Sequence, residues 1–288
     1  MQLIVSLYPE FPVRLPFSYY HSLSASVYET FRSFDESFAQ ELHNGLNSAS
    51  RIKLLAISPL FSNVMEVHGG GKGSHNKDQN KDYYLLFKGT TSFRIATPIP
   101  NLARASISAF SNTNFLRIGS HVFRVNSVEI LKEPIFKREM TWIPPENASI
   151  VTSWSSKEER KKLYQFPVNR REKLPDSHLL LEGNLIHKWK RLVEKAPDIC
   201  KKWAGEENIS SDELKNMGDS IKINVAILTD HNRFHYKTRL HQLKNTPVRS
   251  WRAPVKVMGP EWIQKLIWNC GLGQLNTMGF GLVQEMLS

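Results

Sequence analysis

Four glycines crowd the eleven-residue stretch GLGQLNTMGFG, which begins at Gly271 near the end of the sequence. Glycine loses more conformational entropy on folding than any other residue, so such a cluster indicates backbone with positive φ or a ligand close to the backbone. Residues 260–271 before it read as a helix that begins at Pro260 and ends at Gly271, and residues 279–286 read as a strand. The fold therefore closes with a helix, a glycine-rich loop and a strand.

Two glycine motifs of nucleotide-binding proteins do not fit this chain. A dinucleotide fingerprint needs a third glycine where Asn276 stands. A Walker loop needs Ser or Thr after its lysine, whereas Gly73 follows Lys72 in the other glycine cluster. The sequence thus predicts no nucleoside triphosphate site. In an α+β sandwich such a loop lies over the sheet, where glycine lets backbone N–H groups face an elongated ligand.

The chain has 288 residues, of which 41% are hydrophobic, enough for two domains with their own cores. Apolar runs stay well short of the roughly 18 residues that span a bilayer. Because the first residues also lack a signal-peptide pattern, we expect a cytoplasmic protein without a membrane partner. Cys200 and Cys270 lie far apart without a C-x-x-C spacing, so we expect reduced, buried thiols and no zinc site.

The chain is strongly basic, with a formal net charge of +11, and most of the excess lies in its second half. This favours a polyanionic partner, although basic surfaces also serve solubility. Phe234, Tyr236 and Trp251 are interleaved with the basic residues Lys222, Arg233, Lys237, Arg239, Lys244, Arg249, Arg252 and Lys256. We expect the cations to hold RNA phosphates and the rings to stack on unpaired bases. The alternative is a solvated basic face.

The same basic segment could also be interpreted as a metal site, formed by Asp230, His231, His235 and His241. Its surroundings are too basic to attract a cation, and the segment lacks the acidic cluster of a two-metal nuclease. We therefore expect no metal and no other cofactor.

Hydrophobic periodicity gives both halves of the chain the element order β-α-β-β-α-β. In the first half the expected strands lie within 2–8, 51–58, 83–97 and 121–131, and the expected helices within 19–34, 35–45 and 100–110. In the second half the expected strands lie within 148–154, 220–228, 252–259 and 279–286, and the expected helices within 178–196 and 260–271. The polar segment 68–82 reads as a surface loop. The order predicts an α+β fold with domains at 1–140 and 149–288 and a linker at 141–148.

Two of the expected helices are amphipathic. The first places on one face Leu23, Val27, Phe31 and Phe34. The helix at 178–196 places on one face Leu185, Trp189, Leu192 and Ala196, and mostly on the other Lys188, Lys190, Arg191 and Lys195. We expect the apolar faces to pack on the sheets and the cations to face solvent.

The C-terminal stretch resembles the glycine-rich loop of the CRISPR repeat-processing endoribonucleases of the RAMP superfamily, which has the form G-h-G-x-x-x-x-x-G-F-G. The matching residues are Gly271, Gly273, Gly279, Phe280 and Gly281. The segments GNLIHKWKRL, LPFSYYHSLSASVYETF, AQELHNG and KLLAIS are also similar to that family, so the resemblance covers nearly the whole chain. It implies two tandem ferredoxin-like (RRM-like) domains and an RNA backbone close to the loop. The chain departs from the family at Gln274 and Leu275, where a Lys or Arg often follows the second glycine. Phosphate contacts would then come from backbone N–H groups and from other segments.

The resemblance also implies chemistry: cleavage of RNA without metal by attack of a 2′-hydroxyl on the adjacent phosphate, which leaves a 2′,3′-cyclic phosphate and a 5′-hydroxyl. It assigns general acid-base catalysis to His43, an assisting or orienting role to Tyr28, and stabilisation of developing charge to Lys53. The alternatives are a helix-capping role for His43 and a packing role for Tyr28. Arg51 could replace Lys53, and His21 is a second candidate histidine.

Two functions from different classes follow. The first is an endoribonuclease that cuts CRISPR precursor transcripts within the repeat, and the second is a non-catalytic RNA-binding RAMP subunit of an interference complex. The order Tyr28, His43, Lys53 favours the enzyme, since a scaffold does not need that histidine. The expected partner is CRISPR repeat RNA, as precursor and product. Other interference-complex subunits and a second copy in a homodimer are further candidates.

Overall fold

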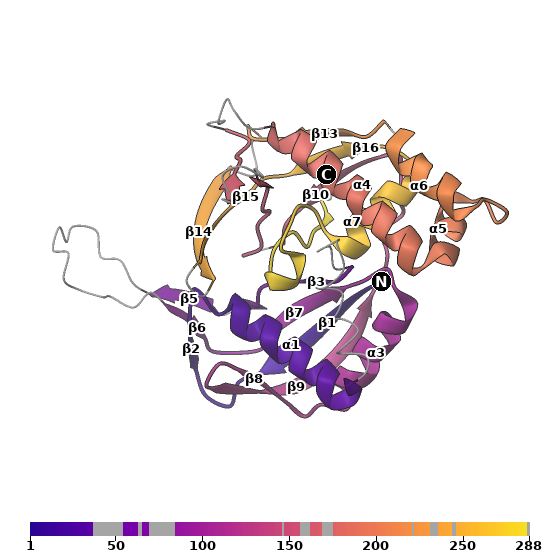
Figure 1. Cartoon of the computed structure of the whole chain (residues 1–288). Helices are drawn as coiled ribbons and strands as arrows, with labels where there is room; N and C mark the ends of the chain where they lie inside the picture. The colour runs from indigo at the N-terminus through magenta and orange to yellow at the C-terminus, as the bar shows by residue number, and fades with distance from the viewer. Residues whose placement is uncertain are drawn as a thin grey trace.

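The structure of the protein is a computed structural model (Figure 1). It describes residues 1–36, 54–62, 65–68, 84–145, 147–155, 162–168, 175–220, 222–230, 236–243 and 246–286. Several predictions fall outside these ranges: the helix at 35–45 after its first two residues, the loop at 68–82 after its first residue, and the roles of His43, Arg51, Lys53, His231, Arg233, Phe234, His235 and Lys244.

The first half of the chain forms an antiparallel sheet with two helices on one side (Figure 1). The strand order is β3-β7-β1-β9-β8, and β4 also pairs with β7. The strands are β1 (Gln2–Tyr8), β3 (Ala56–Ile57), β4 (Phe61–Ser62), β7 (Thr91–Ala96), β8 (Phe115–Ile118) and β9 (His121–Leu131), and the helices are α1 (Tyr20–Phe34) and α3 (Pro100–Ser111). Numbered along the chain, β9-β1-β7-β3 is the 4-1-3-2 order of a ferredoxin-like β-α-β-β-α-β unit.

Simple periodicities explain how these elements meet. In β1, alternate residues from Leu3 to Leu7 are buried, which is the two-residue period of a strand with one face in the core. In α1 the expected apolar face is confirmed for Leu23, Val27 and Phe31. Phe34 is exposed instead, because it is the last residue of the helix and lies past the core contact.

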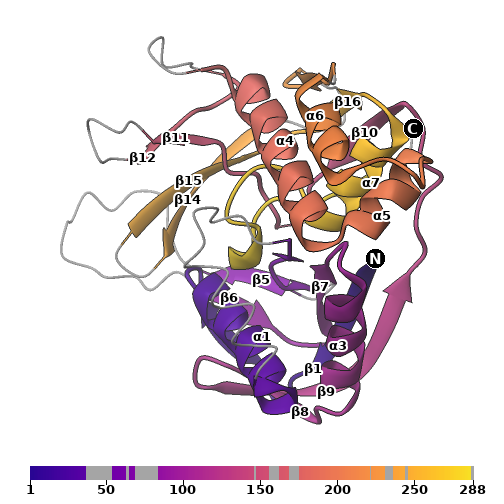
Figure 2. The ribbon, with the colours of Figure 1, turned by 45° about the vertical axis from the view of Figure 1, so that its right-hand side comes forward.

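The second half forms a smaller antiparallel sheet in the order β13-β16-β10-β17. Its strands are β10 (Glu139–Ile143), β13 (Asn224–Ile227), β16 (Val255–Met258) and β17 (Gln284–Glu285). Its helices are α4 (Ser177–Lys195) and α7 (Glu261–Cys270), with α5 (Pro197–Ala204) and α6 (Ser211–Ser220) beside them (Figure 2). Numbered along the chain, this order is 2-3-1-4, again ferredoxin-like, so the predicted tandem fold is confirmed.

The first strand of the second sheet, β10, lies partly in the segment that was expected to be a linker. Met140 and Trp142 are buried at alternate positions, and the two prolines that follow Ile143 end the strand. The expected strand at 148–154 does not join this sheet. Instead β11 (Ser153–Ser155) pairs with β12 (Lys162–Tyr164). The predicted strand is therefore present only from Ser153 onward, and its expected place in the second sheet was wrong, whereas the domain limits at 140 and 149 stay a prediction.

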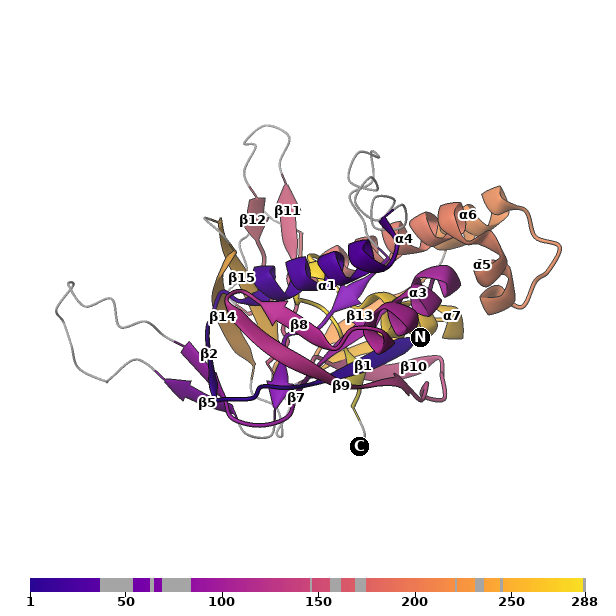
Figure 3. The ribbon, with the colours of Figure 1, turned by 90° about the horizontal axis from the view of Figure 1, so that it is seen from below.

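Two further groups of strands stand beside the sheets. One is the hairpin of β14 (Lys237–Leu243) and β15 (Thr246–Arg252), and the other joins β2 (Val13–Pro16), β6 (Tyr84–Phe87) and β5 (Met65–His68). Figure 3, seen from below, shows β14-β15 and β11-β12 at one side of the molecule, away from α5 and α6. The glycine-rich loop follows α7 and contains a short 3-10 helix, η1 (Asn276–Met278), between the two sheets (Figures 1 and 2).

Each sheet has its own hydrophobic cluster, and the glycine-rich loop contributes to both. Phe280 packs in the first cluster with α1, whereas Leu272 and Val283 pack in the second. Cys200 and Cys270 are free and buried, as expected. Among the described helices, none combines the length and the hydropathy needed to cross a bilayer.

Candidate nucleic-acid interface

The glycine-rich loop folds tightly upon itself, and its four glycines all have positive φ. A Cβ atom at Gly281 would overlap the carbonyl oxygen of Leu272. At Gly273 a Cβ atom would lie 2.5 Å from the carbonyl oxygen of Val151, which is closer than real side chains approach. Glycine is therefore required here because the chain's own backbone comes so close.

All five residues of the glycine motif are buried: Gly271, Gly273, Gly279, Phe280 and Gly281. Between them, Gln274, Leu275, Thr277 and Met278 are only half-buried, and Leu275 itself has a positive φ of 59°. An RNA lying on the loop would thus meet these four half-buried residues first. Contact between RNA and the motif residues stays a prediction.

Polar side chains of the loop form hydrogen bonds both within the loop and to a neighbouring strand. The amide nitrogen of Asn276 donates to the carbonyl oxygens of Leu272 and Phe280, at 3.2 and 3.1 Å. Gln274, where the family often has a cation, donates from its side-chain amide to the carbonyl oxygen of Ser153 at 3.0 Å and accepts a bond from the Ser153 hydroxyl. Gln274 therefore ties the loop to β11.

Lys188 of α4 is buried against this loop, contrary to the expectation that it faces solvent. Its Nζ donates to the carbonyl oxygens of Cys270, Gly271 and Gly273, at 3.2, 2.8 and 3.0 Å. Position 188 borders the apolar stripe of α4, because it lies three residues after Leu185. Burial lowers the pKa of Lys188 to about 8, an effect that Cys270 partly offsets. The carbonyl groups at the end of α7 suit a cation, because that end of a helix carries partial negative charge.

Tyr28 of α1 is brought against the same loop. It is half-buried, and burial raises the pKa of its hydroxyl to about 12, an effect that a hydrogen bond with the Thr277 side chain partly offsets. The 3-10 helix η1 also lies against β3, the strand that begins at Ala56. The structure thus joins one predicted catalytic residue to the glycine-rich loop. His21, the second candidate histidine, is half-buried in the first turn of α1.

The β14-β15 hairpin carries the described part of the predicted basic surface. Lys237 and Arg249 are exposed, and Arg239 and Arg252 are half-buried. Lys237 and Arg252 are cross-strand partners, so two cations stand side by side on the hairpin. Arg239 also donates to the carbonyl oxygen of Asn147 at 3.0 Å, which ties the first strand of the hairpin to the segment between β10 and β11.

Trp251 cannot stack on RNA bases in this structure, contrary to prediction. It is fully buried, its backbone bridges Ile150, and its ring nitrogen donates to the Thr152 hydroxyl at 2.9 Å. The covering segment comes from a distant part of the sequence, so the hairpin's own pattern does not reveal it. Tyr236 is half-buried.

Comparison with known proteins identifies the family. The model described as CRISPR associated protein Cas6, C-terminal, matches residues 131–285, more than half of the chain. The chain belongs to the Cas6 family. A solved structure named CRISPR associated protein Cas6 superposes with a TM-score of 0.67 at 18% sequence identity, covering 100% of this chain and 99% of that one. No curated protein matches the sequence.

Two more solved structures share the fold of this Cas6-family chain. A Cas6-related protein from Pyrococcus furiosus has a TM-score of 0.68 at 15% identity and covers 99% of this chain and 98% of its own. A RAMP protein described as binding different RNA substrates has a TM-score of 0.68 at 16% identity, with 100% of both chains covered. At these identities the likeness concerns the fold alone.

His241, one member of the alternative metal site, is used inside the Cas6 fold. Its Nε2 lies 3.0 Å from the hydroxyl of Ser250, and its ring meets the rings of Tyr20 and Phe280 edge-on, with centroids 5.0 Å apart. Burial, and then the charge of Arg239, lower its pKa to about 4. The hairpin is thus anchored to α1 and to the glycine-rich loop through a neutral histidine.

This buried histidine predicts a specific loss of stability in acid. Between pH 6.5 and 4 the unfolded chain gains a proton at His241 and the folded chain does not, so the free energy of unfolding falls as the pH falls, by up to about 3 kcal/mol. His241→Gln should flatten this part of the curve in urea unfolding at several pH values. Parallel curves for the variant and the wild type would contradict the assignment.

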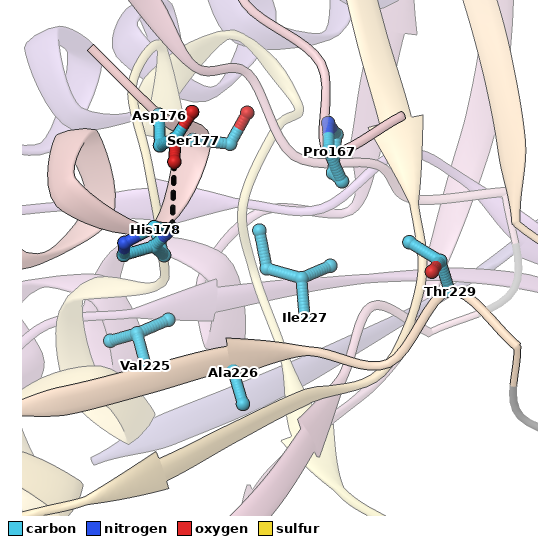
Figure 4. Close-up of a pocket in the computed structure, with 8 residues that line it drawn as sticks. All are labelled: Pro167, Asp176, Ser177, His178, Val225, Ala226, Ile227 and Thr229. Atoms are coloured by element: carbon cyan, nitrogen blue, oxygen red, sulfur yellow. Dashed lines mark ion pairs between the residues drawn. The ribbon is translucent and has the colours of Figure 1, made fainter. Parts of the chain in front are cut away.

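A pocket of about 260 Å³ opens at the start of α4 (Figure 4). It is lined by Pro167, Asp176, Ser177, His178, Val225, Ala226, Ile227 and Thr229. His178 Nδ1 and Asp176 Oδ2 lie 3.9 Å apart at its edge. The lining includes no predicted site residue, so the pocket is separate from the glycine-rich loop.

Sequence reasoning missed two residues at the interface, Lys188 and Thr277. Lys188 could have been noticed because it borders the apolar stripe of α4, although a lysine there usually faces solvent. Thr277 gives no local signal, because its contact with Tyr28 joins segments that are far apart in the sequence.

Proposed function

We propose that this Cas6-family chain is a metal-independent endoribonuclease that cleaves CRISPR precursor RNA within the repeat. The product ends would be a 2′,3′-cyclic phosphate and a 5′-hydroxyl, and the released repeat fragment becomes part of the mature guide RNA. The observation that carries the proposal is the contact between Tyr28 and Thr277, which brings a residue of the predicted catalytic set onto the glycine-rich loop. Family membership and a RAMP relative described as binding RNA substrates support it.

In the proposed reaction His43 is the general acid or base, and Lys53 stabilises the charge that develops on the phosphate. Both lie outside the described residues. Tyr28 has a different role, which is to bind the phosphate through its hydroxyl group. Because its pKa is about 12, its hydroxyl keeps its proton at neutral pH and can donate a hydrogen bond to a phosphate oxygen. Tyr28 therefore orients the phosphate and does not act as the base.

The β14-β15 hairpin is the proposed surface for the rest of the RNA. Like charges directly opposite one another on a hairpin destabilise it, and Lys237 faces Arg252 in this way. A phosphate group bound beside this pair would contact two cations at once. The hairpin contacts the glycine-rich loop where the ring of His241 packs on the ring of Phe280. RNA held on the hairpin would thus run toward Tyr28.

The test is cleavage of labelled repeat RNA from the host's CRISPR array in the presence of EDTA, with both new ends mapped. We expect a single cut in each repeat, a 5′-hydroxyl on the downstream fragment, and no dependence on added divalent metal. Binding without any cut would indicate the alternative, a non-catalytic RNA-binding RAMP subunit of an interference complex. Size-exclusion chromatography of the same sample, with and without RNA, tests whether the chain forms the homodimer named above as a candidate.

A further inference from the structure

The glycine-rich loop has an inward-facing ring of carbonyl oxygens, and one side chain fills it. The oxygens of Cys270, Gly271 and Gly273 converge on the Nζ of Lys188, which is 1% exposed. An ammonium group has three donors, so the three bonds use its full capacity. Without it, three carbonyl dipoles would point at one another in a space closed to water.

These three carbonyls belong to the part of the loop where the backbone turns most sharply. Gly271 and Gly273 have φ of 71° and 67°, and Cys270 ends α7, whose last carbonyls have no partner within the helix. Lys188 therefore caps the helix and fixes the first turn of the loop at once. It reaches across from α4, so it also fixes the loop relative to the second sheet.

The other end of this rigid turn carries the contact with Tyr28. Asn276 bridges the two sides of the loop, and Thr277 is the next residue. The direction in which Thr277 meets Tyr28 is thus set by a turn whose interior is held by Lys188. From this geometry we infer that Lys188 is a positioning residue: its ammonium group sets the glycine-rich loop in the shape that places Thr277 on Tyr28.

The effect on catalysis rests on the function proposed above, but the effect on the loop does not. The closing experiment therefore has two separate measurements on Lys188→Met, a variant that keeps an unbranched side chain one atom shorter and removes the three donors. The first is amide hydrogen exchange of the peptide over residues 271–281 without RNA. The backbone N–H of Leu272 donates to the Gly281 carbonyl oxygen within the loop, and the N–H groups of Gln274 and Gly281 donate to the carbonyl oxygens of Val151 and Ser149. Their exchange therefore reports the shape and seating of the loop.

Gln264→Met is the matched control. Gln264 is also fully buried, and it lies within α7. It accepts a bond from the ring nitrogen of Trp142 at 2.7 Å and donates to the carbonyl oxygen of Val257 at 3.0 Å. Its replacement removes buried hydrogen bonds from the same half of the chain, and none of these bonds involves residues 271–281. We expect Lys188→Met to speed exchange in the loop by at least about tenfold, and Gln264→Met to leave loop exchange unchanged.

The second measurement is single-turnover cleavage at saturating protein, together with RNA affinity. Lys188→Met is expected to slow the cleavage step by about tenfold or more while the dissociation constant for repeat RNA changes little, because the hairpin cations remain. If Lys188→Met does not fold, Lys188→Gln, which retains an amide donor, should show the same exchange effect at a smaller size. Loop exchange equal to that of the wild type would overturn the inference. Faster exchange in a protein that never cuts RNA would leave it standing and refute the proposed function.

Discussion

Replacing His43 by alanine is expected to slow cleavage of repeat RNA by a factor on the order of 10²–10⁴. Attack by a 2′-hydroxyl needs a group that accepts its proton and a group that protonates the leaving 5′ oxygen. Histidine changes its protonation state near neutral pH, so it suits this exchange better than any other side chain. Since the basic hairpin would still hold the RNA, the dissociation constant should stay close to that of the wild type.

The measurement is single-turnover cleavage of labelled repeat RNA in EDTA, beside a filter-binding titration of the same RNA. His187→Ala is the matched control, because His187 is an exposed histidine of α4 outside the proposed site. Its cleavage rate should equal that of the wild type. If His43→Ala cuts at the wild-type rate, His43 has no acid-base role, and His21 becomes the histidine to replace next. If His43→Ala loses RNA binding as well, the residue contributes to the fold or to the RNA surface.

The parts of the fold that the sequence predicted are those set by local patterns. The apolar spacing of Leu23, Val27 and Phe31 predicted α1, and Pro260 and Gly271 predicted the two ends of α7. The glycine cluster predicted positive φ, which the structure confirms at all four glycines. Each of these signals depends on a few neighbouring residues, so no distant partner is needed to interpret it.

Apart from Phe34, which lies at the end of α1 beyond the core, the errors involve partners that are distant in the sequence. β10 exists because Trp142 pairs with Val255 on one side and with Glu285 on the other, more than a hundred residues away. Lys188 is buried because loop carbonyls more than eighty residues away surround its ammonium group. A residue's type fixes how costly its burial is, but only the assembled fold supplies the groups that compensate that cost.

In the candidate site, too, the sequence could not show which groups approach the glycines. Their number correctly indicated that something approaches the backbone closely. The sequence suggested RNA, whereas the structure shows Leu272, Val151 and the ring of Tyr20 in that position. These contacts give the glycines a structural role that does not require bound RNA. The residues open to a ligand are the half-buried ones between the glycines.

Substituting alanine for Gly281 is therefore expected to lower the free energy of unfolding by about 3–5 kcal/mol. The residue has a φ of 73°, where an L side chain is strained, and its Cβ atom would overlap both the carbonyl oxygen of Leu272 and the side-chain amide of Asn276. To make room the loop must open, and opening breaks the bond from Leu272 N–H to the Gly281 carbonyl oxygen. Urea unfolding followed by tryptophan fluorescence measures the loss.

Gly183→Ala is the matched control, for which we expect the free energy of unfolding to rise instead of fall. Gly183 lies in the interior of α4, and a Cβ atom there would meet nothing within 4 Å. Alanine should stabilise that helix by roughly 0.5–1 kcal/mol, because it loses less backbone entropy on folding than glycine does. If Gly281→Ala were as stable as the wild type, the loop could not have the turn described here. Since Thr277 reaches Tyr28 only through that turn, the proposed arrangement of the site would fail with it.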